Sequence, residues 1–278
     1  MKTWFITGAS RGFGLRIARL ALARGDNVVA TARQPQAIIS ALENHPQLLA
    51  LPLDVTDEKA AAEAAGRAVA RFGRVDVLVN NAGYGLLGAV EESTAGEVRR
   101  LYDTNVFGLL NVTRAVLPVM RHQRSGHVIN ISSIGGYMAY QGWGVYGSTK
   151  FAVEGITEAL AQELKPLGIH ATVVEPGFFR TDFLDASSLS TTSEINDYAE
   201  TVGAMRRFAA GANHQQPGDP YKLACAMLVL ADAANPPTRL ALGSDTVARI
   251  HEKNALVERE LNEWLAVSLS TDHSAQTN

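Results

Sequence analysis

The feature that most constrains the fold is a short apolar strand placed directly before a glycine-rich turn. Residues 4–7 form the strand, the turn contains Gly8, Gly12 and Gly14, and an amphipathic segment with Ile17 and Leu20 follows. Glycines let a backbone turn tightly and approach a phosphate, while a helix N-terminus offers free N–H groups and a positive dipole end. The order strand, turn, helix therefore predicts an α/β fold with a pyrophosphate site. The spacing G-x-x-x-G-x-G differs from the G-x-G-x-x-G fingerprint, so the glycines alone are weak evidence.

The rest of the chain alternates between strand-like and helix-like segments. We expect strands at residues 3–7, 27–31, 48–53, 75–80, 127–132, 170–175 and 239–242. Helices are expected at 57–72, 96–120 and 145–164. Right-handed crossovers would wind these helices onto both faces of the sheet. The prediction is an α/β, three-layer, Rossmann-type doubly wound sheet of about seven parallel strands, with ligands at the carboxyl ends of the strands.

Composition agrees with one enzyme domain over residues 1–278. The chain has no Pro/Gly/Ser-rich linker or tandem repeat, and 46% of its residues are hydrophobic. A net charge of -3 without a basic stripe gives no reason to expect a nucleic-acid partner. No segment approaches the roughly 18 apolar residues of a membrane span, and no signal peptide is visible, so we expect a cytoplasmic protein without a membrane partner. Cys225 is the only cysteine, and no histidine spacing suggests a metal site.

A phenol, an ammonium and a hydroxyl come together in the middle of the sequence. Tyr146 and Lys150 are four residues apart and share one face if their segment is helical. Ser132 and Ser133 end the strand expected before them. A nearby cation favours the phenolate, which would lower the pKa of Tyr146 toward the range of efficient acid and base chemistry. Both serines are candidates because alternate strand residues face opposite sides, and the thirteen-residue spacing to Tyr146 favours Ser133.

Together these motifs resemble the short-chain dehydrogenase/reductase family, in its single-domain branch. The resemblance runs from Lys2 to about Thr181 and rests on five motifs in the family's order. They are the TGxxxGxG turn at residues 7–14, Asp54-Val55, residues 80–83 (NNAG), the set Asn105, Ser133, Tyr146 and Lys150, and Pro176-Gly177 with Thr181. The departures are mild: Phe13 replaces a smaller aliphatic residue, and residues 147–149 replace a commoner x-Ala-Ser. None of them removes a reacting group.

The resemblance implies a role for each motif. Asn105, Ser133, Tyr146 and Lys150 would form the catalytic tetrad, with Asn105 holding a water that connects Lys150 to solvent. The implied nicotinamide-dinucleotide contacts are Gly8, Ser10, Arg11, Gly12, Phe13, Gly14, Asp54, Val55, Asn81, Ala82, Gly83, Tyr146, Lys150, Pro176, Gly177 and Thr181. In reduction, Tyr146 would give a proton to the carbonyl oxygen while Ser133 hydrogen-bonds that oxygen. Oxidation of an alcohol would reverse these roles.

Charge at the end of the second expected strand bears on the choice of cofactor. A preference for NAD would place an acid there, against the ribose 2'-hydroxyl. The chain instead has Arg33, and Arg11 precedes the second glycine of the turn. Two guanidiniums could bracket a 2'-phosphate, which predicts NADP(H) in preference to NAD(H). The alternative is that both arginines are solvated surface charges, and Arg11 in particular could point away.

The substrate side of the site is less clearly marked. Residues 182–220 show no long period and are expected to form a mobile lid. The residues that suggest an apolar, aromatic-rimmed pocket for a ketone or its alcohol are Ile134, Met138, Tyr140, Trp143, Phe179 and Phe183. Equally, Met138 and Tyr140 could simply pack the hinge of the lid. Residues 28–33 and 133–138 also resemble 17β-hydroxysteroid dehydrogenase members of the family, which does not by itself imply a steroid substrate.

The C-terminal segment 246–267 is expected to be a helix, and residues 268–278 a frayed tail. Its apolar residues Val247, Ile250, Leu256, Leu261 and Trp264 are spaced for packing. The resemblance implies homodimers or homotetramers that pair through the helices of Asn105 and Tyr146. The leading hypothesis is an NADPH-dependent carbonyl reductase for lipophilic ketones. The alternatives are an NADP-dependent steroid-type dehydrogenase that works in oxidation, and an NADP(H)-sensing protein without catalysis.

Overall fold

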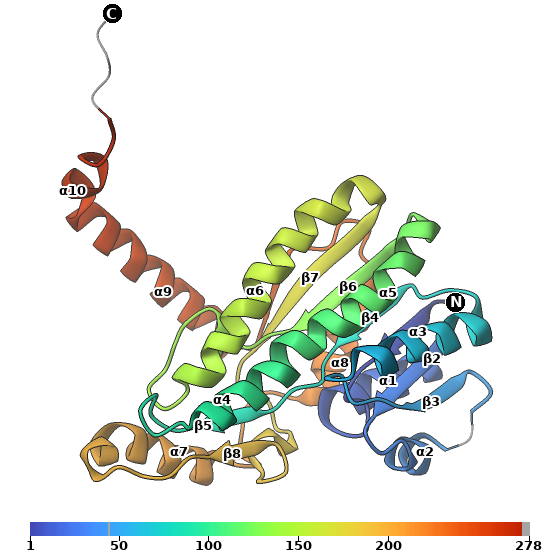
Figure 1. The fold of residues 1–278 in the computed structure, drawn as a ribbon, viewed down its shortest axis with the longest axis horizontal. Helices are drawn as coiled ribbons and strands as arrows, with labels where there is room; N and C mark the ends of the chain where they lie inside the picture. The colour runs from blue at the N-terminus through green and yellow to red at the C-terminus, as the bar shows by residue number, and fades with distance from the viewer. Residues whose placement is uncertain (44, 274–278) are drawn as a thin grey trace, which may run out of the picture.

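A computed structural model describes residues 1–43 and 45–273, and its centre is a parallel sheet (Figure 1). The seven strands lie in the order β3-β2-β1-β4-β6-β7-β9. Their bounds are Thr3–Ile6 (β1), Asn27–Ala32 (β2), Leu48–Pro52 (β3), Val77–Asn80 (β4), Gly126–Ile131 (β6), Ile169–Pro176 (β7) and Arg239–Leu242 (β9). The seven predicted strands and their parallel pairing are confirmed.

Helices cover both faces of the sheet and complete three layers. One face carries α1 (Gly12–Ala23), α2 (Gln36–Leu42) and α8 (Pro220–Asp232), and the other carries α3 (Glu58–Phe72), α5 (Leu109–Gln123) and α6 (Gly144–Leu164). Successive strand residues point to opposite faces. Trp4 accordingly packs in the core with α1 and α8, while Phe5 packs in the core with α3 and α5. The predicted Rossmann-type fold is therefore confirmed.

The helix predicted at 96–120 is interrupted by a π-helical segment. It consists of α4 (Ala95–Tyr102), a π-helix at Asp103–Gly108 and α5. Thr94 and Glu97 form a capping box at the start of α4. π-helical turns often occur at functional sites, and this one contains Asn105.

Residues 182–220 contain short ordered elements that the sequence pattern did not predict. Strand β8 (Leu189–Thr191) pairs in parallel with β5 (Gly85–Leu87), and α7 spans Ala204–Ala212. Short helical turns occupy Asp182–Leu184, Asn196–Tyr198 and Ala199–Gly203. These elements lie together beside β5 and α4 (Figure 1). A three-residue strand and isolated turns are too short to give a detectable hydrophobic period.

The C-terminal helix extends away from the body of the protein (Figure 1). Helix α9 spans Ser244–Glu263 and α10 spans Leu265–Leu269, so the predicted frayed tail begins inside a helix, and residues 274–278 lie outside the described residues. The prediction that the apolar residues of this segment pack is wrong for the single chain, since Leu261 is 55% and Trp264 64% exposed. Spacing indicates an apolar stripe, but it does not specify what the stripe contacts. Within the described part of the chain, no helix has the length and apolar character needed to cross a membrane.

Candidate active site

The predicted site residues converge on a cavity of about 880 Å³ at the carboxyl ends of the strands. Loops after β1, β2, β3, β4, β6 and β7 contribute to its wall. The predicted cofactor residues that line it are Gly8, Ser10, Arg11, Gly12, Phe13, Arg33, Asp54, Val55, Asn81, Ala82, Gly83, Tyr146, Lys150, Pro176, Gly177 and Thr181. Among the predicted catalytic residues, Ser133, Tyr146 and Lys150 line the same cavity. One parallel sheet thus brings together motifs that lie far apart in the sequence.

Backbone geometry explains the glycines of the first turn. Gly8 and Gly12 have φ angles of +63° and +56°, in the left-handed region that favours glycine. Gly14 is not part of the cavity wall, and its role is close packing. A Cβ on Gly14 would lie 2.6 Å from the carbonyl oxygen of Gly8 and 2.7 Å from Nδ2 of Asn81. This amide also donates hydrogen bonds of 3.0 Å to the carbonyl oxygens of Thr7 and Gly8, so the turn is tied to the loop after β4.

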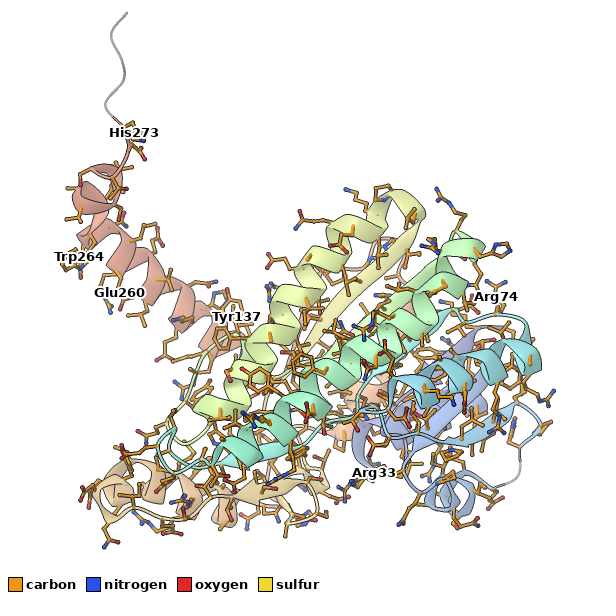
Figure 2. All side chains as sticks on the ribbon, in the orientation of Figure 1. Arg33, Arg74, Tyr137, Glu260, Trp264 and His273 are labelled. Carbon is orange, nitrogen blue, oxygen red and sulfur yellow. The ribbon has the colours of Figure 1, made fainter. Side chains whose placement is uncertain are left out.

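The nucleotide end of the cavity has the chemistry that a dinucleotide requires. Its wall combines the glycine turn at the start of α1 with Arg33 after β2 and Asp54 after β3. Arg33 is exposed and lines this wall. Its position in the fold is labelled in Figure 2. Arg11 also lines the cavity, but its guanidinium donates to Oγ of Ser187 at 2.6 Å and to the carbonyl oxygen of Ser187 at 2.7 Å. Arg33 therefore fits the predicted phosphate role directly, while Arg11 connects the glycine turn to residues 182–220.

Helix α6 carries both Tyr146 and Lys150 into the cavity, one helical turn apart. The ammonium of Lys150 lies 5.8 Å from the centre of the Tyr146 ring and donates to the carbonyl oxygen of Ile131 at 2.9 Å. Ser133 follows β6, and its Oγ accepts a hydrogen bond from the backbone N–H of Gly135 at 3.1 Å. Strand β6 and helix α6 thus hold the hydroxyl, the phenol and the ammonium at one end of the cavity.

The structure corrects the expectation that the pKa of Tyr146 is lowered. Burial raises this pKa because it disfavours the phenolate, and a hydrogen bond with Ser133 only partly opposes the rise. Burial has the opposite effect on Lys150 and lowers its pKa to about 8, against an opposing attraction from the carboxylate of Glu154. The phenol is consequently protonated at neutral pH, which is the form a proton donor needs.

Asn105 is buried next to the cavity without forming part of its wall. Its Oδ1 accepts from the backbone N–H of Tyr84 at 3.1 Å, and its Nδ2 donates to the carbonyl oxygen of Tyr84 at 3.0 Å and to Oγ1 of Thr149 at 3.1 Å. Asn105 therefore connects the loop after β4 to helix α6. Its predicted role in holding a water stays a prediction.

The two serines after β6 occupy different surroundings. Ser133 hydrogen-bonds with Tyr146, whereas Ser132 is 3% exposed and lies against the turn Ile134–Gly136, where a Cβ on Gly136 would lie 2.5 Å from its Oγ. Glu154 continues this buried polar region and forms an ion pair with Arg239. The geometry agrees with the choice of Ser133 as the serine that faces the phenol.

An aromatic cluster surrounds Tyr146 on the substrate side. The Trp143 ring lies edge-on to Tyr146 at 5.6 Å between ring centres, and Phe183 lies 5.6 Å from Tyr146 and 6.3 Å from Trp143. Five of the six predicted pocket residues line the cavity, namely Ile134, Tyr140, Trp143, Phe179 and Phe183. Met138 is outside the wall, which corrects its assignment. It lies between the short helical turn Ile134–Gly136 and Tyr140, both of which contribute to the wall.

Sequence reasoning missed wall residues that come from distant parts of the chain. Gln216 precedes α8 and is 3% exposed, and Asp245 and Arg249 lie in the first turns of α9. The carboxylate of Asp245 accepts from the backbone N–H of Phe178 at 2.8 Å and so braces the loop after β7. No motif or spacing marks these residues, because only the packing of the C-terminal half brings them to the site.

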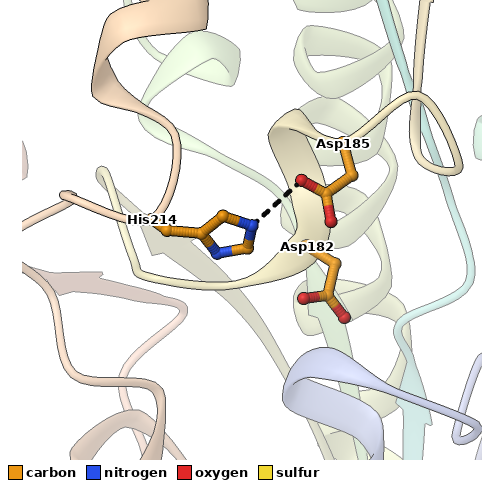
Figure 3. A group of neighbouring side chains, drawn as sticks. All are labelled: Asp182, Asp185 and His214. Carbon is orange, nitrogen blue, oxygen red and sulfur yellow. Dashed lines mark ion pairs between the residues drawn. The ribbon is translucent and has the colours of Figure 1, made fainter.

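A histidine and two aspartates lie close together (Figure 3), and Asp182 of this group lines the cavity. Nε2 of His214 lies 3.2 Å from Oδ1 of Asp185, and Nδ2 of Asn213 donates to the same oxygen at 2.6 Å. Asp182 lies within the same group, in which one ligand-type atom from each residue falls within 4.8 Å of the others. Exposed acidic groups are common without an ion, so the prediction of no metal stays a prediction. The sequence separation between Asp185 and His214 concealed this contact.

Comparison with known proteins decides the family. The family profile described as short chain dehydrogenase matches residues 2–191. The chain belongs to the short-chain dehydrogenase family. Two of its relatives are Oxidoreductase BOA17 of Botryotinia fuckeliana, 37% identical over 97% of this chain and 99% of that protein, and 3-ketodihydrosphingosine reductase of Bacteroides thetaiotaomicron, 40% identical over 86% of each chain. As a short-chain dehydrogenase, the protein is an oxidoreductase that acts on CH–OH or C=O groups.

Solved structures of short-chain dehydrogenases share the fold. A short-chain dehydrogenase from Streptomyces avermitilis is 44% identical with a TM-score of 0.91, over 98% of this chain and 100% of that chain. ElxO with NADP bound is 28% identical with a TM-score of 0.74, over 89% and 99% of the two chains. A family member from Burkholderia phymatum in complex with NAD is 23% identical with a TM-score of 0.82, over 93% and 95%. Nicotinamide cofactors are thus the family's cofactors, as the NADP bound to ElxO illustrates.

Proposed function

We propose that this short-chain dehydrogenase is an NADPH-dependent carbonyl reductase for lipophilic ketones, which also oxidises the corresponding secondary alcohols. The observation that carries the proposal is that Arg33 and the Ser133, Tyr146 and Lys150 group line one cavity at two separate ends, because β1 and β4 lie between β2 and β6. The additional phosphate of NADP(H) would bind at the first end, next to Arg33. The carbonyl group of the substrate would bind at the second end, next to Tyr146.

The preference for NADP(H) rests on charge at the end of β2. An acid at this place would favour a free ribose 2'-hydroxyl, whereas Arg33 offers a planar guanidinium that suits a phosphate. Arg11 lies in the glycine turn and would add a second positive charge beside the phosphate. To do so, its guanidinium must exchange its hydrogen bonds to Ser187 for contacts with the phosphate. The NADP-bound relative ElxO supports this choice by resemblance.

The catalytic roles follow from protonation and position. When bound, the nicotinamide supplies the hydride that reaches the carbonyl carbon. Tyr146 donates its phenolic proton to the carbonyl oxygen, and Ser133 stabilises that oxygen as negative charge develops on it. The Lys150 ammonium stabilises the phenolate that remains. Asn105 holds the loop after β4 against α6 and so positions Lys150.

The substrate class follows from the wall next to Tyr146. Trp143, Phe183 and Leu189 supply apolar surface there, and Phe208 extends it. Such a wall suits an aliphatic or aromatic ketone better than a charged one. The relative named 3-ketodihydrosphingosine reductase supports reduction of a ketone. We expect residues 182–220 to serve as the lid over this substrate.

We also propose that copies of the chain pair through the helices that carry Asn105 and Tyr146. Phe107 is 53% exposed on the π-helical segment before α5, and Phe151 is 43% exposed on α6. Burial of these two rings would stabilise a homodimer or homotetramer.

The proposal is tested by titrating NADPH and NADH separately while following nicotinamide fluorescence, with wild type and Arg33→Ala, and then assaying a panel of ketones. We expect NADPH to bind at least about tenfold more tightly than NADH and to lose that advantage in the variant. Arg71→Ala is the control, because this guanidinium is not part of the cavity wall and donates a hydrogen bond to the carbonyl oxygen of Pro46. Equal affinity for the two cofactors would refute the NADP preference, and binding without turnover of any ketone would favour the sensing alternative.

A further inference from the structure

Helices α9 and α10 leave an apolar stripe exposed along the projecting arm of the molecule. Thr246 is the buried residue of α9, and the arm contacts its own body mainly at its first turns, near β9 and the turn Ile134–Gly136. Beyond this base, Leu261, Trp264 and Val267 are 55%, 64% and 56% exposed. Figure 2 shows Trp264 on the projecting arm. A helix with such a stripe gains most of its stability by packing the stripe against another surface.

The stripe follows a heptad pattern. Apolar residues alternate at spacings of three and four, with one asparagine among them. The positions are Val247, Ile250, Asn254, Val257, Leu261 and Trp264. Val247 and Val257 are 46% and 47% exposed, so the stripe has exposed apolar side chains from the base to the end of α9. This spacing is that of a two-helix coiled-coil seam.

We propose that α9 is a self-association surface, on which α9 of a second copy of this chain packs in the antiparallel direction. In the favoured register, Val247 faces Trp264 of the second copy, Ile250 faces Leu261 of the second copy, and Asn254 faces Val257 of the second copy. The twofold symmetry repeats each contact. Such an interface is isologous and closes on itself.

Charges beside the seam select this register. It places Lys253 opposite Glu260 of the second copy and His251 opposite Glu258 of the second copy, each pair twice. A shift by one heptad in one direction would place Lys253 against Lys253 of the second copy. A shift in the other direction would place Glu258 and Glu260 each against its own counterpart. In a parallel arrangement, the one favourable contact would be Lys253 with Glu258 of the second copy. Complementary flanking charges set both orientation and partner in coiled coils.

The base of α9 relates this surface to the cavity. Asp245 braces the loop after β7 through its hydrogen bond to Phe178, and Arg249 lines the cavity one turn later. Tyr137, four residues after Ser133, donates a hydrogen bond of 2.5 Å to Oδ1 of Asn254. A partner that holds α9 in place would therefore also hold this part of the wall. The proposed contact is separate from pairing through α5 and α6, and it does not depend on the proposed reaction.

Sedimentation velocity over a range of protein concentrations tests the proposal on the full chain. We expect the double variant Leu261→Glu/Trp264→Glu to halve the mass of the wild-type assembly, with unchanged circular dichroism because both side chains are exposed. Ala255→Glu is the control: it adds one negative charge on α9 away from the seam and should leave the mass unchanged. A wild type that is monomeric at all concentrations, or a double variant with the wild-type mass, would overturn the proposal.

A charge exchange tests the direction of the helices. Lys253→Glu should weaken association on the order of fivefold, because it makes both copies of the Lys253–Glu260 pair repulsive. Adding Glu260→Lys should restore the wild-type association. Restoration by Glu258→Lys instead would indicate parallel helices and overturn the proposed register.

Discussion

The two ends of the cavity are built in different ways. The nucleotide end is formed by short loops directly after strands, and Gly14 and Asn81 hold these loops by contacts within the nearest strand–turn–helix units. The substrate end is formed by residues 182–220 and the base of α9, which come from far along the chain. Polar contacts help to hold it in place, including the ion pair between the buried Glu92 and Arg206 and the link between Arg11 and Ser187. Close backbone packing thus fixes the first end, while the aromatic cluster of Trp143 and Phe183 and a few separable polar contacts hold the second.

Among the changes that compare the two ends, the largest expected effect comes from filling the space at Gly14. In Gly14→Ala the new Cβ would lie 2.6 Å from the carbonyl oxygen of Gly8, so the turn must shift. We expect NADPH binding to weaken by about 100-fold and the free energy of unfolding to fall by about 1–3 kcal/mol. Isothermal titration and urea denaturation measure the two changes.

Gly66→Ala is the matched control for this substitution. Gly66 lies in α3, with nothing within 4 Å of the added Cβ. Here alanine should stabilise the protein by about 0.5–1 kcal/mol and leave binding unchanged. If both variants bind NADPH like wild type, the nucleotide end is not sterically fixed.

At the substrate end we expect Glu92→Gln to loosen residues 189–206. Glu92 accepts hydrogen bonds from the backbone N–H groups of Ala89 and Ile195 at 2.7 and 2.8 Å and pairs with Arg206 at 2.8 Å. Loss of the charge should lower the free energy of local opening of this segment by about 3 kcal/mol. Hydrogen exchange should show faster exchange in this segment and unchanged exchange in β1 and α1. Equal acceleration in both regions would mean that the two ends are not independent.

The same carboxylate predicts a pH dependence. Burial alone would raise the pKa of Glu92, but hydrogen bonds from Ile195, Ala89 and Arg206 overcome it and lower the pKa to about 2 from an ordinary 4.5. Because the folded pKa is the lower one, the stabilisation is present above pH 4.5 and is lost as the pH falls from there toward 2. The difference in stability between wild type and Glu92→Gln should shrink over this window. A constant difference would contradict this assignment.

A moderate effect is expected from pH at the reacting end. As the pH rises through about 8, Lys150 loses the charge that stabilises the developing phenolate, so kcat for reduction should fall about tenfold per unit above this value. Glu154→Gln should shift the inflection to lower pH, because it removes the carboxylate that favours the charged lysine. A kcat that stays constant to pH 10 would exclude this role for Lys150.

The smallest expected effect concerns the contact between the two ends. Ser187→Ala removes one acceptor of Arg11 and should make the guanidinium more available to a phosphate. We expect NADPH to bind about twofold more tightly, with NADH unchanged. Ser190→Ala, at another position of the cavity wall, is the control. A weaker NADPH affinity would show that the Arg11 contact supports binding instead of competing with it.

The same contrast explains what could be predicted from the sequence. The seven strands, the glycine turn and the positions of Ser133, Tyr146 and Lys150 follow from local spacing and from one rule about the carboxyl ends of parallel strands. The π-helical segment at Asn105, the pairing of β5 with β8 and the approach of Asp245 to the loop after β7 depend on contacts between distant residues. The raised pKa of Tyr146 was missed because its burial is a property of the packed cluster with Trp143 and Phe183. The exposed stripe of α9 was misjudged because periodicity indicates an apolar face without identifying its partner.

The central claim is that Tyr146 is the proton donor in hydride transfer, and single-turnover kinetics tests it most directly. Stopped-flow fluorescence would follow oxidation of bound NADPH by a ketone that the assays identify, with wild type and Tyr146→Phe. Phenylalanine keeps the ring contacts to Trp143 and Phe183 and removes only the hydroxyl. We predict an NADPH affinity within about twofold of wild type and a hydride-transfer rate that falls by about 100-fold to 10,000-fold. A variant that binds NADPH normally and transfers hydride at the wild-type rate would contradict the account.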